Sequence, residues 1–252
     1  MTILVLGHKG MLGHMVYKYL LDQGYTIDIV EDRFPSEDFK SKVSGYSGDY
    51  IINCIGAIPQ KTSNFEINTE LPVWLSTNTS VRVVHPGTDC EIDEDAYGLS
   101  KRAAKDFLTS NSVNTKILKA SIIGPELGSK ASLLEWYLGS TGDVKGYSNA
   151  MWSGITTLEW AEQCSTLLNN WNNYSSETII ESTCLSKYNL LYLIKEVFEV
   201  ESNILLDNTV KVDKCLVGTI KALHIKEQLE NLKKYYYNGS TKRILSGNRR
   251  SN

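Results

Sequence analysis

The side chains of Tyr97 and Lys101 could together carry out acid–base chemistry. They are four positions apart, so on a helix both side chains would point to the same side. A tyrosine hydroxyl has a reference pKa of about 10 and exchanges protons poorly at neutral pH. A neighbouring ammonium favours the phenolate and lowers that pKa, which makes the tyrosine a usable general acid. Such pairs are also common on amphipathic surface helices, so the catalytic interpretation depends on what lies upstream.

A glycine-rich turn near the start of the chain, Gly7-His8-Lys9-Gly10-Met11-Leu12-Gly13, supplies that context. The apolar run at residues 3–6 predicts a buried strand before it, and apolar residues at helical spacing predict a helix after it. In such a strand–turn–helix unit, the N–H groups of the first helical turn face a pyrophosphate, and glycines let the backbone come close. The candidate cofactor-binding residues of the turn are Gly7, Lys9, Gly10, Met11, Leu12 and Gly13. The spacing G-x-x-G-x-x-G departs from the commonest dinucleotide pattern, and a purely structural turn is the alternative.

Glu31 and Arg33 follow the second predicted strand and bear on the choice of cofactor. An acid about 20 residues beyond the glycine turn usually binds the ribose 2′-hydroxyl of NAD, whereas an arginine nearby accommodates the 2′-phosphate of NADP. A solvated charged loop is the alternative for both, so NADPH and NADH stay open as cofactors. Cys54, Ile55 and Gly56 lie at the end of the third predicted strand, where small residues would let the backbone approach a ribose.

Thr88 follows a fourth predicted strand, and its hydroxyl could hold a substrate carbonyl oxygen. In a doubly wound sheet, the carboxyl ends of the strands and the first glycine turn converge on one crevice. Thr88, Tyr97 and Lys101 are therefore the candidate catalytic residues.

Strands and helices alternate along the first half of the chain. The predicted strands lie at residues 3–6, 26–30, 50–55, 81–85 and 116–123, with 177–181 as one last strand of the main sheet. This pattern predicts an α/β fold, a Rossmann-type doubly wound parallel sheet with helices on both faces. Residues 1–125 and about 155–182 would form this NAD(P)-binding domain. Residues 126–154 and 183–240 would form a small carboxyl-terminal substrate lobe, and residues 241–252 a loosely ordered tail.

The composition is that of an ordinary globular protein, with 42% hydrophobic and 22% charged residues among 252. A formal charge of −3 gives no electrostatic reason to expect a nucleic-acid or membrane partner. No apolar run approaches the roughly 18 residues that a transmembrane helix needs, and we expect no signal peptide. The five cysteines are widely spaced, which predicts free thiols in a reducing, cytoplasmic compartment. We expect no metal site, because the histidines and cysteines lack metal-ligand spacing.

Taken together, these segments resemble an extended short-chain dehydrogenase/reductase, and within that group the dTDP-4-dehydrorhamnose reductase and related nucleotide-sugar reductases. The resemblance is carried by residues 7–13, Thr88-Asp89-Cys90, residues 97–101 and residues 152–157. It implies that Tyr97 gives a proton to the C4 ketone of a nucleotide-linked 4-keto-6-deoxyhexose while NAD(P)H delivers hydride. It also implies that Lys101 binds the nicotinamide ribose and that Thr88 orients the ketone.

The remaining expectations concern the substrate. The resemblance places Asp89 and Cys90 beside it, and Lys145 and Trp152 lie where the main sheet is interrupted, a place that usually lines the substrate pocket. For Trp152, burial in the core of the lobe is the alternative. A homodimer is left open.

Two rival functions remain. The separation between Thr88 and Tyr97 is nine residues, whereas the resembled family has a much longer loop there, so contacts that this loop makes to substrate are missing. Nucleotide-sugar dehydratases carry an Asp-Glu pair directly after the threonine, but here Cys90 follows Asp89 and Glu91 comes one place late; an epimerase or dehydratase with bound NAD therefore ranks lower. A non-catalytic NAD(P)-binding regulatory subunit ranks lower because such relatives tend to lose the tyrosine or the lysine.

Overall fold

The computed structural model describes residues 1–237, so the predicted tail at 241–252 lies outside the described residues. Its main sheet has seven strands in the order β12-β9-β5-β4-β3-β1-β2, and all neighbouring strands are parallel. The strands are β1 (Thr2–Leu6), β2 (Thr26–Ile29), β3 (Tyr50–Asn53), β4 (Arg82–Gly87), β5 (Thr115–Lys119), β6 (Ile122–Ile123), β7 (Asp143–Trp152), β8 (Ile155–Thr156), β9 (Glu177–Glu181), β10 (Leu185–Ser186), β11 (Asn203–Lys214) and β12 (Ile220–Lys221).

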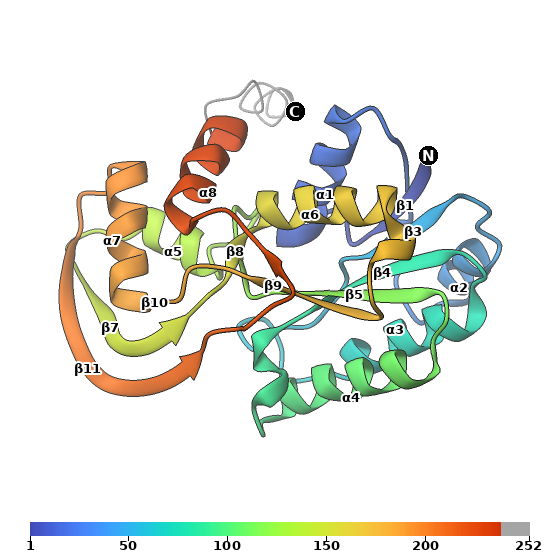
Figure 1. Cartoon of the computed structure of the whole chain (residues 1–252), viewed down its shortest axis with the longest axis horizontal. Helices are drawn as coiled ribbons and strands as arrows, with labels where there is room; N and C mark the ends of the chain where they lie inside the picture. The colour runs from blue at the N-terminus through green and yellow to red at the C-terminus, as the bar shows by residue number, and fades with distance from the viewer. Residues whose placement is uncertain (238–252) are drawn as a thin grey trace, which may run out of the picture.

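Helices cover both faces of this sheet, with α1 and α6 on one face and α3 and α4 on the other (Figure 1). The α-helices are α1 (Met11–Asp22), α2 (Glu37–Ser44), α3 (Ile67–Asn78), α4 (Ala96–Asn111), α5 (Leu133–Leu138), α6 (Thr157–Asn169), α7 (Lys187–Phe198) and α8 (Ile225–Leu232). Shorter turns are 3-10 helices at Asp89–Ile92 and Trp171–Asn173 and a π-helical turn at Lys233–Tyr237. We name the first of these the 89–92 turn and the last the tyrosine turn. The architecture confirms the predicted Rossmann-type α/β fold.

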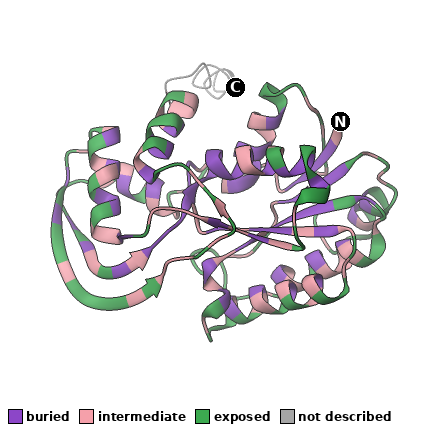
Figure 2. Ribbon diagram, in the orientation of Figure 1, coloured by how far each residue is buried: buried purple, intermediate pink, exposed green. Residues whose placement is uncertain are grey.

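The central strands form because their side chains are apolar on both faces. Every residue of β3 is buried, as are four of the five residues of β1, which is the pattern of a parallel strand covered by helices on either side. Two apolar clusters result, one on each side of the sheet. Figure 2 shows the buried strands in the middle of the molecule and the exposed arm of β11 at its edge.

The lobe is built on a second sheet of three strands, in the order β10-β7-β11. β7 and β11 form a long curved parallel pair, against which α7 packs (Figure 1). Sequence analysis did not predict β11, and it placed β12 in the lobe, whereas β12 pairs with β9 at the edge of the main sheet. The strand predicted at 116–123 is divided into β5 and β6, and β6 pairs with β8, which comes directly before α6.

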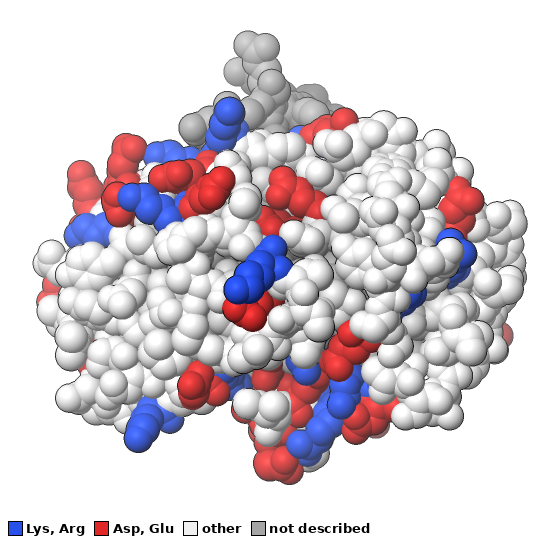
Figure 3. Space-filling model, viewed as in Figure 1, with Lys and Arg blue, Asp and Glu red and all other residues white. Residues whose placement is uncertain are grey.

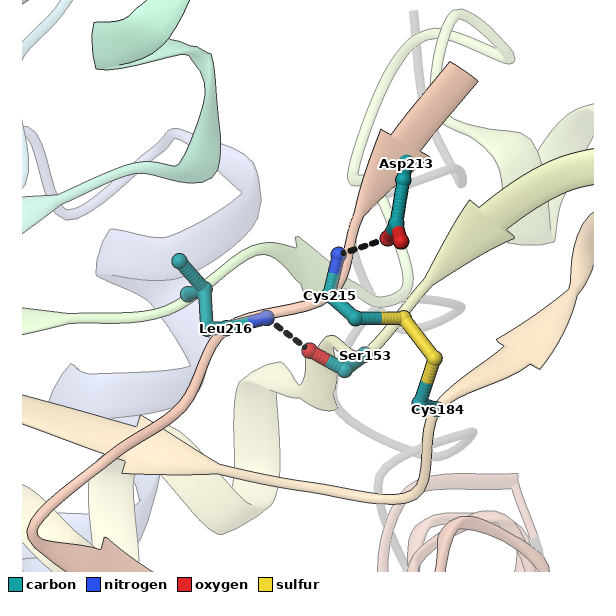
Figure 4. Close-up of a disulfide and its surroundings, with 5 residues drawn as sticks. All are labelled: Ser153, Cys184, Asp213, Cys215 and Leu216. Atoms are coloured by element: carbon teal, nitrogen blue, oxygen red, sulfur yellow. Dashed lines mark hydrogen bonds between the residues drawn. A yellow bond between two sulfur atoms is a disulfide. The ribbon is translucent and has the colours of Figure 1, made fainter. Parts of the chain in front are cut away.

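Two of the five cysteines are joined, which contradicts the prediction that all would be free. Cys184 and Cys215 form a disulfide with a Cα–Cα distance of 5.6 Å (Figure 4). The two positions are 31 residues apart in sequence, and no short motif marks them as partners. Cys54, Cys90 and Cys164 are free thiols. The inference of a reducing compartment therefore fails for the bonded pair.

Charged side chains of both signs are interspersed on the face shown in Figure 3, and many are paired. Within residues 1–237, every helix is too short or too polar to cross a bilayer.

Candidate active site

The glycine turn folds tightly between β1 and α1. Gly7 has a positive φ of 76°, and Gly10 donates its N–H to the Gly7 carbonyl over 2.8 Å. A Cβ on Gly13 would collide with the Gly7 carbonyl oxygen, so Gly13 must be glycine for the turn to close on α1. Gly10 caps α1 without any side-chain hydrogen bond, and the first turn of the helix holds no acidic residue. The first N–H groups of α1 are thus directed at a position suited to an anion.

The end of β3 lies against this turn. A Cβ on Gly7 would meet Ile55 Cγ1 at 2.9 Å and the Cys54 carbonyl oxygen at 3.0 Å. Gly56 follows, and the Asn68 side chain accepts from the N–H of Ala57 over 2.7 Å. The structure therefore brings the predicted residues 54–56 together with the glycine turn.

Glu31 bends back onto the glycine turn. Its carboxylate accepts from Lys9 Nζ over 2.6 Å and lies 3.3 Å from His8 Nε2. The hydrogen bond from Lys9 is the main favourable interaction that holds the pKa of Glu31 below its usual value. Among the described residues, the exposed Arg33 side chain makes no hydrogen bond or ion pair. An anionic group near Glu31 would therefore find Lys9 and Arg33 as its cationic neighbours.

Tyr97 and Lys101 lie on the first turns of α4, which Asp95 caps by accepting from the Gly98 N–H over 2.7 Å. The Tyr97 ring packs edge-on against Phe65, with 5.6 Å between the centroids. Burial raises the pKa of the Tyr97 hydroxyl, whereas the neighbouring Thr88 side chain acts in the opposite direction. The prediction that Lys101 lowers the pKa of Tyr97 below its usual value is therefore wrong for this structure. Tyr97 holds its proton at neutral pH, as a proton donor must before it acts.

Lys101 is buried below Tyr97, and its Nζ donates to the Pro86 carbonyl at the end of β4 over 3.2 Å. Burial lowers the pKa of Lys101 to about 8. His85 lies beneath it, and burial together with the charge of Lys101 holds the pKa of His85 well below its usual value. A neutral His85 pairs with the side-chain amide of Asn53 over 3.2 Å. The sequence patterns did not predict this polar layer of Asn53 and His85, although both residues stand at or near the ends of apolar strands.

Thr88 ends β4 and caps the 89–92 turn. Its N–H donates to Glu91 Oε1 over 2.9 Å, and its hydroxyl accepts from the Cys90 N–H over 3.3 Å, a reciprocal capping box. Glu91 is buried and pairs with Lys119 Nζ at 2.6 Å. The segment between Thr88 and Tyr97, although short, therefore forms a defined turn that keeps the Thr88 side chain close to Tyr97.

The four residues predicted to contact the substrate do not all lie together in the structure. Asp89 and Cys90 lie beside Thr88, with Asp89 accepting from the Thr88 hydroxyl over 3.0 Å. Trp152 is 5% exposed, and its indole N–H donates to Ser121 over 2.8 Å. Lys145 pairs with Asp207 on β11 and stands roughly 20 Å further back along β7. The fold brings together Thr88, Asp89, Cys90, Tyr97 and Lys101, whereas Lys145 lies near the start of β7, away from them.

Lys214 is a residue that sequence analysis missed. It ends β11, beside Trp152 in the strand pairing, and its Nζ reaches Cys90 Sγ at 3.4 Å. Burial raises the pKa of Cys90 to about 11, and the nearby Lys214 acts against that rise. No motif surrounds Lys214, so only the fold could reveal its place.

No protein-family model matches the sequence, and no curated protein sequence matches it. Solved structures do match over nearly the whole chain. A dTDP-4-dehydrorhamnose reductase from Bacillus anthracis, solved with NADP, has a TM-score of 0.78 at 14% identity and covers 93% of this chain and 99% of its own. The dTDP-4-dehydrorhamnose reductase of Clostridium acetobutylicum has a TM-score of 0.73 at 16% identity, with the same coverage.

A dTDP-glucose 4,6-dehydratase from Bacillus anthracis, solved with NAD, also has a TM-score of 0.73, at 12% identity, over 97% of this chain and 99% of its own. Reductase and dehydratase structures are thus similar to this chain to a comparable degree. The fold implied by the resemblance to extended short-chain dehydrogenases is therefore confirmed: the chain has the architecture of these nucleotide-sugar enzymes.

Proposed function

We propose that the protein is an NAD(P)H-dependent reductase of the C4 ketone of a nucleotide-linked 4-keto-6-deoxyhexose, acting in the synthesis of deoxysugars or surface glycans. The observation that carries the proposal is the grouping of Thr88, Tyr97 and Lys101 at the carboxyl end of β4. The similarity of the whole chain to nucleotide-sugar reductases supports it.

The residues of the glycine turn fit a dinucleotide. The N-terminus of α1 carries no side-chain cap, and the Nδ1 atom of His8 is buried without a hydrogen-bond partner among residues 1–237. The N–H groups of Met11 and Leu12 would bind the pyrophosphate, and Gly10, without a Cβ, would let it come close to the backbone. The end of β3 at residues 54–56 would lie along the ribose. Bound NAD(P)H would supply the hydride.

The chain's own residues supply the proton and the orientation. Tyr97, protonated at neutral pH, donates to the ketone oxygen as that oxygen becomes an alkoxide. Thr88 holds the same oxygen through its hydroxyl. Lys101 binds the nicotinamide ribose, and its charge favours the tyrosinate that remains after the proton has left. Asp89 and Cys90 line the sugar site, and Trp152 stays a proposed substrate contact. Lys145, which pairs with Asp207 further along β7, lies too far from Tyr97 to touch the same sugar.

For the cofactor we favour NADPH over NADH. Arg33 is exposed beside the end of β2, and Lys9 stands opposite Glu31. A 2′-phosphate could draw both cations to itself, and Lys9 would then exchange its carboxylate partner for the phosphate.

The contacts of Glu91 favour reduction over dehydration. A dehydratase needs a carboxylic acid beside its threonine to exchange protons with the sugar. Here the Glu91 carboxylate is buried, capped by the Thr88 N–H and paired with Lys119. It is committed to the turn, so we rank the dehydratase and epimerase interpretations lower. Tyr97 and Lys101 are both present, which argues against a regulatory subunit without catalysis.

The decisive experiment mixes the protein with NADPH or NADH and a panel of 4-keto nucleotide sugars and follows the absorbance of the reduced nicotinamide. We expect oxidation with at least one member of the panel. Tight cofactor binding without oxidation of NADPH or NADH by any substrate would favour the regulatory interpretation. A homodimer and a cytoplasmic location remain proposals; the latter follows from the biosynthetic role and no longer from the cysteines.

A further inference from the structure

Lys214 connects the lobe to the segment between Thr88 and Tyr97. From the end of β11 its ammonium donates to Cys90 Sγ at 3.4 Å and forms an ion pair with Asp93. The Lys214 side chain is 20% exposed and that of Asp93 28%. Both charges are thus partly removed from water. In such a partly buried position, a charge-assisted hydrogen bond contributes more to stability than it does on an open surface.

The two residues that Lys214 holds are also the ones that position α4. A Cβ on Gly98 would meet the carbonyl oxygens of Cys90 and Asp93, each at 2.6 Å. The backbone after Thr88 therefore lies directly against the residue that follows Tyr97. Any displacement of Cys90 or Asp93 would move the first turn of α4, and Tyr97 with it.

The backbone that carries Lys214 is anchored by the disulfide. Cys215, the next residue, is bonded to Cys184 just before β10, and the neighbouring backbone is held by two hydrogen bonds (Figure 4). Asp213 accepts from the Cys215 N–H over 2.9 Å, and Ser153 accepts from the Leu216 N–H over 2.6 Å. Cys184 and Ser153 both lie next to strands of the lobe sheet, so the disulfide fixes the end of β11 to the body of the lobe.

We propose that Lys214 is a positioning residue, which holds the backbone between Thr88 and Tyr97 in its catalytic arrangement, and that the Cys184–Cys215 disulfide holds Lys214 in place. Only the kinetic consequence rests on the proposed reductase reaction. The short connection between Thr88 and Tyr97 explains the need for such a contact. Lys119 fixes this connection from the main sheet through Glu91, and Lys214 fixes it from the lobe.

Reduction of the disulfide therefore loosens the site. Dithiothreitol gives two electrons and two protons to the disulfide, forming two thiols, and is itself oxidised to its cyclic disulfide. The end of β11 then depends on hydrogen bonds and strand pairing alone. The ion pair between Lys214 and Asp93 is then formed in a smaller fraction of the molecules, and the 89–92 turn opens more often.

The test measures amide hydrogen exchange over residues 88–98 in the whole chain. Lys214→Met should speed exchange of the 89–93 amides about tenfold, because a charge-assisted contact is lost. Lys214→Arg should restore most of the protection. Lys211→Met is the matched control, since Lys211 lies on the same strand and makes no side-chain contact of this kind among residues 1–237. If Lys214→Met destabilises the chain as a whole, Lys214→Gln removes the charge but keeps a polar side chain, one atom shorter, that can still donate a hydrogen bond.

A second experiment tests the disulfide by measuring exchange with and without dithiothreitol in the natural chain and in the double variant Cys184→Ser/Cys215→Ser. Reduction should speed exchange at 89–93 in the natural chain, leave the double variant unchanged, and add little in Lys214→Met. Unaltered exchange in Lys214→Met, or a dithiothreitol effect that persists in the double variant, would overturn the proposal.

Kinetics separate this proposal from the proposed function. If the protein reduces a keto sugar, Lys214→Met should lower kcat by about tenfold or more with little change in KM, because misplaced catalytic groups slow the chemical step. Normal kcat in Lys214→Met would count against Lys214 and leave the reductase assignment intact. Faster exchange at 89–93 in a protein that reduces nothing would support the contact and refute the reductase assignment.

Discussion

Lys101 is buried, and within residues 1–237 only one hydrogen bond compensates the loss of water around its charge. Its Nζ donates to the Pro86 carbonyl, and the neighbouring His85 is neutral. The pKa of Lys101 is lowered to about 8, so folding makes the charged form less favourable, although that form still predominates at pH 7. Catalytic groups are often kept in such costly places, because the same burial that destabilises the fold tunes their proton affinity.

Lys101→Met should therefore stabilise the fold while it abolishes catalysis. The pKa falls from 10.5 unfolded to about 8 folded, so the cost is present in full below pH 8 and disappears as the pH rises through 10.5. We expect Lys101→Met to gain about 1–3 kcal/mol at pH 7 and clearly less at pH 10. Denaturant unfolding at both pH values measures this. A variant that is less stable at pH 7 would show that the Lys101 contacts outweigh the desolvation of its charge.

Tyr97→Phe should remove the proton donor and little else. The ring still packs against Phe65, so the fold and the affinity for cofactor should change little. Loss of a positioned general acid lowers kcat by about 10²–10⁴-fold. Stopped-flow and steady-state rates with the best substrate of the panel measure the loss. Unchanged NADPH oxidation in Tyr97→Phe would rule out Tyr97 as the acid.

Substitutions at Gly10 and at Gly13 should distinguish an effect on cofactor binding from an effect on folding. Gly10 has a φ of −79°, and an added Cβ would lie 3.3 Å from the Gly7 carbonyl oxygen, so Gly10→Ala should fold with a minor adjustment. It should weaken cofactor binding at least about tenfold, because the methyl group stands where the pyrophosphate approaches. Gly13→Ala should lower the melting temperature instead, since its Cβ collides with the turn itself. Calorimetry with NADPH and thermal unfolding of both variants provide the comparison; full affinity in Gly10→Ala would contradict the binding role of the turn.

At the scale of elements, sequence patterns predicted those parts of the fold whose burial is regular. β1 and β3 are continuous apolar runs, and α1 has apolar residues on one face, so each could be recognised alone. β11 could not, because most of its twelve side chains are exposed and pairing with β7 holds it in place. The Cys184–Cys215 bond and the contact of Lys214 with Asp93 depend on how distant segments meet, which no local pattern encodes. The candidate catalytic residues of α4, Tyr97 and Lys101, were recognisable because the chemistry proposed for them depends on spacing along one helix.

α6 carries a carboxylate whose ionisation opposes folding. Burial, aided by the charge of Glu159, raises the pKa of Glu162 to about 7. A raised carboxylate pKa means that the folded state holds a proton that the unfolded state releases, so stability falls as the pH rises from about 4.5 through 7. Glu162→Gln should therefore stabilise the protein at pH 8 by about 1 kcal/mol, after allowance for solvent screening, and leave it unchanged at pH 4. That corresponds to a rise in melting temperature of about 2–4 °C. An equal effect at both pH values would show that the ionisation of Glu162 is not the cause.

At the scale of the whole molecule, the sheet domain and the lobe share one apolar core. The larger cluster runs from Ile3 and Val5 on β1 to Leu229 and Leu232 on α8 without a break. The tyrosine turn, which continues α8, then contacts α1 through its side chains. Tyr235 and Tyr236 both contact α1, through Tyr19 and His14. Tyr237 contacts Phe198 of α7 and Glu135 of α5. The boundary that the sequence suggested between domain and lobe is thus crossed by a continuous interior.

Tyr235→Ala should weaken this junction and lower the stability of both parts together. The Tyr235 hydroxyl donates to Asp22 over 2.5 Å, its ring packs edge-on against Tyr19 at 6.2 Å, and Lys18 lies over it at 4.6 Å. Loss of a half-buried aromatic with these contacts should cost about 2 kcal/mol, or a fall of about 4–8 °C in melting temperature. Tyr192→Ala is the matched control, because Tyr192 is an exposed tyrosine on α7, and it should change stability by only about 0.5 kcal/mol.

Because the core is continuous, near-ultraviolet circular dichroism and tryptophan fluorescence should report one coincident transition in both variants. Two separated transitions in Tyr235→Ala, one for the lobe and one for the sheet domain, would show that the two parts fold independently and meet only through the tyrosine turn. A single transition at the lower temperature would mean that the lobe, with Lys214, and the sheet domain, with Tyr97, are held in register by one cooperative structure.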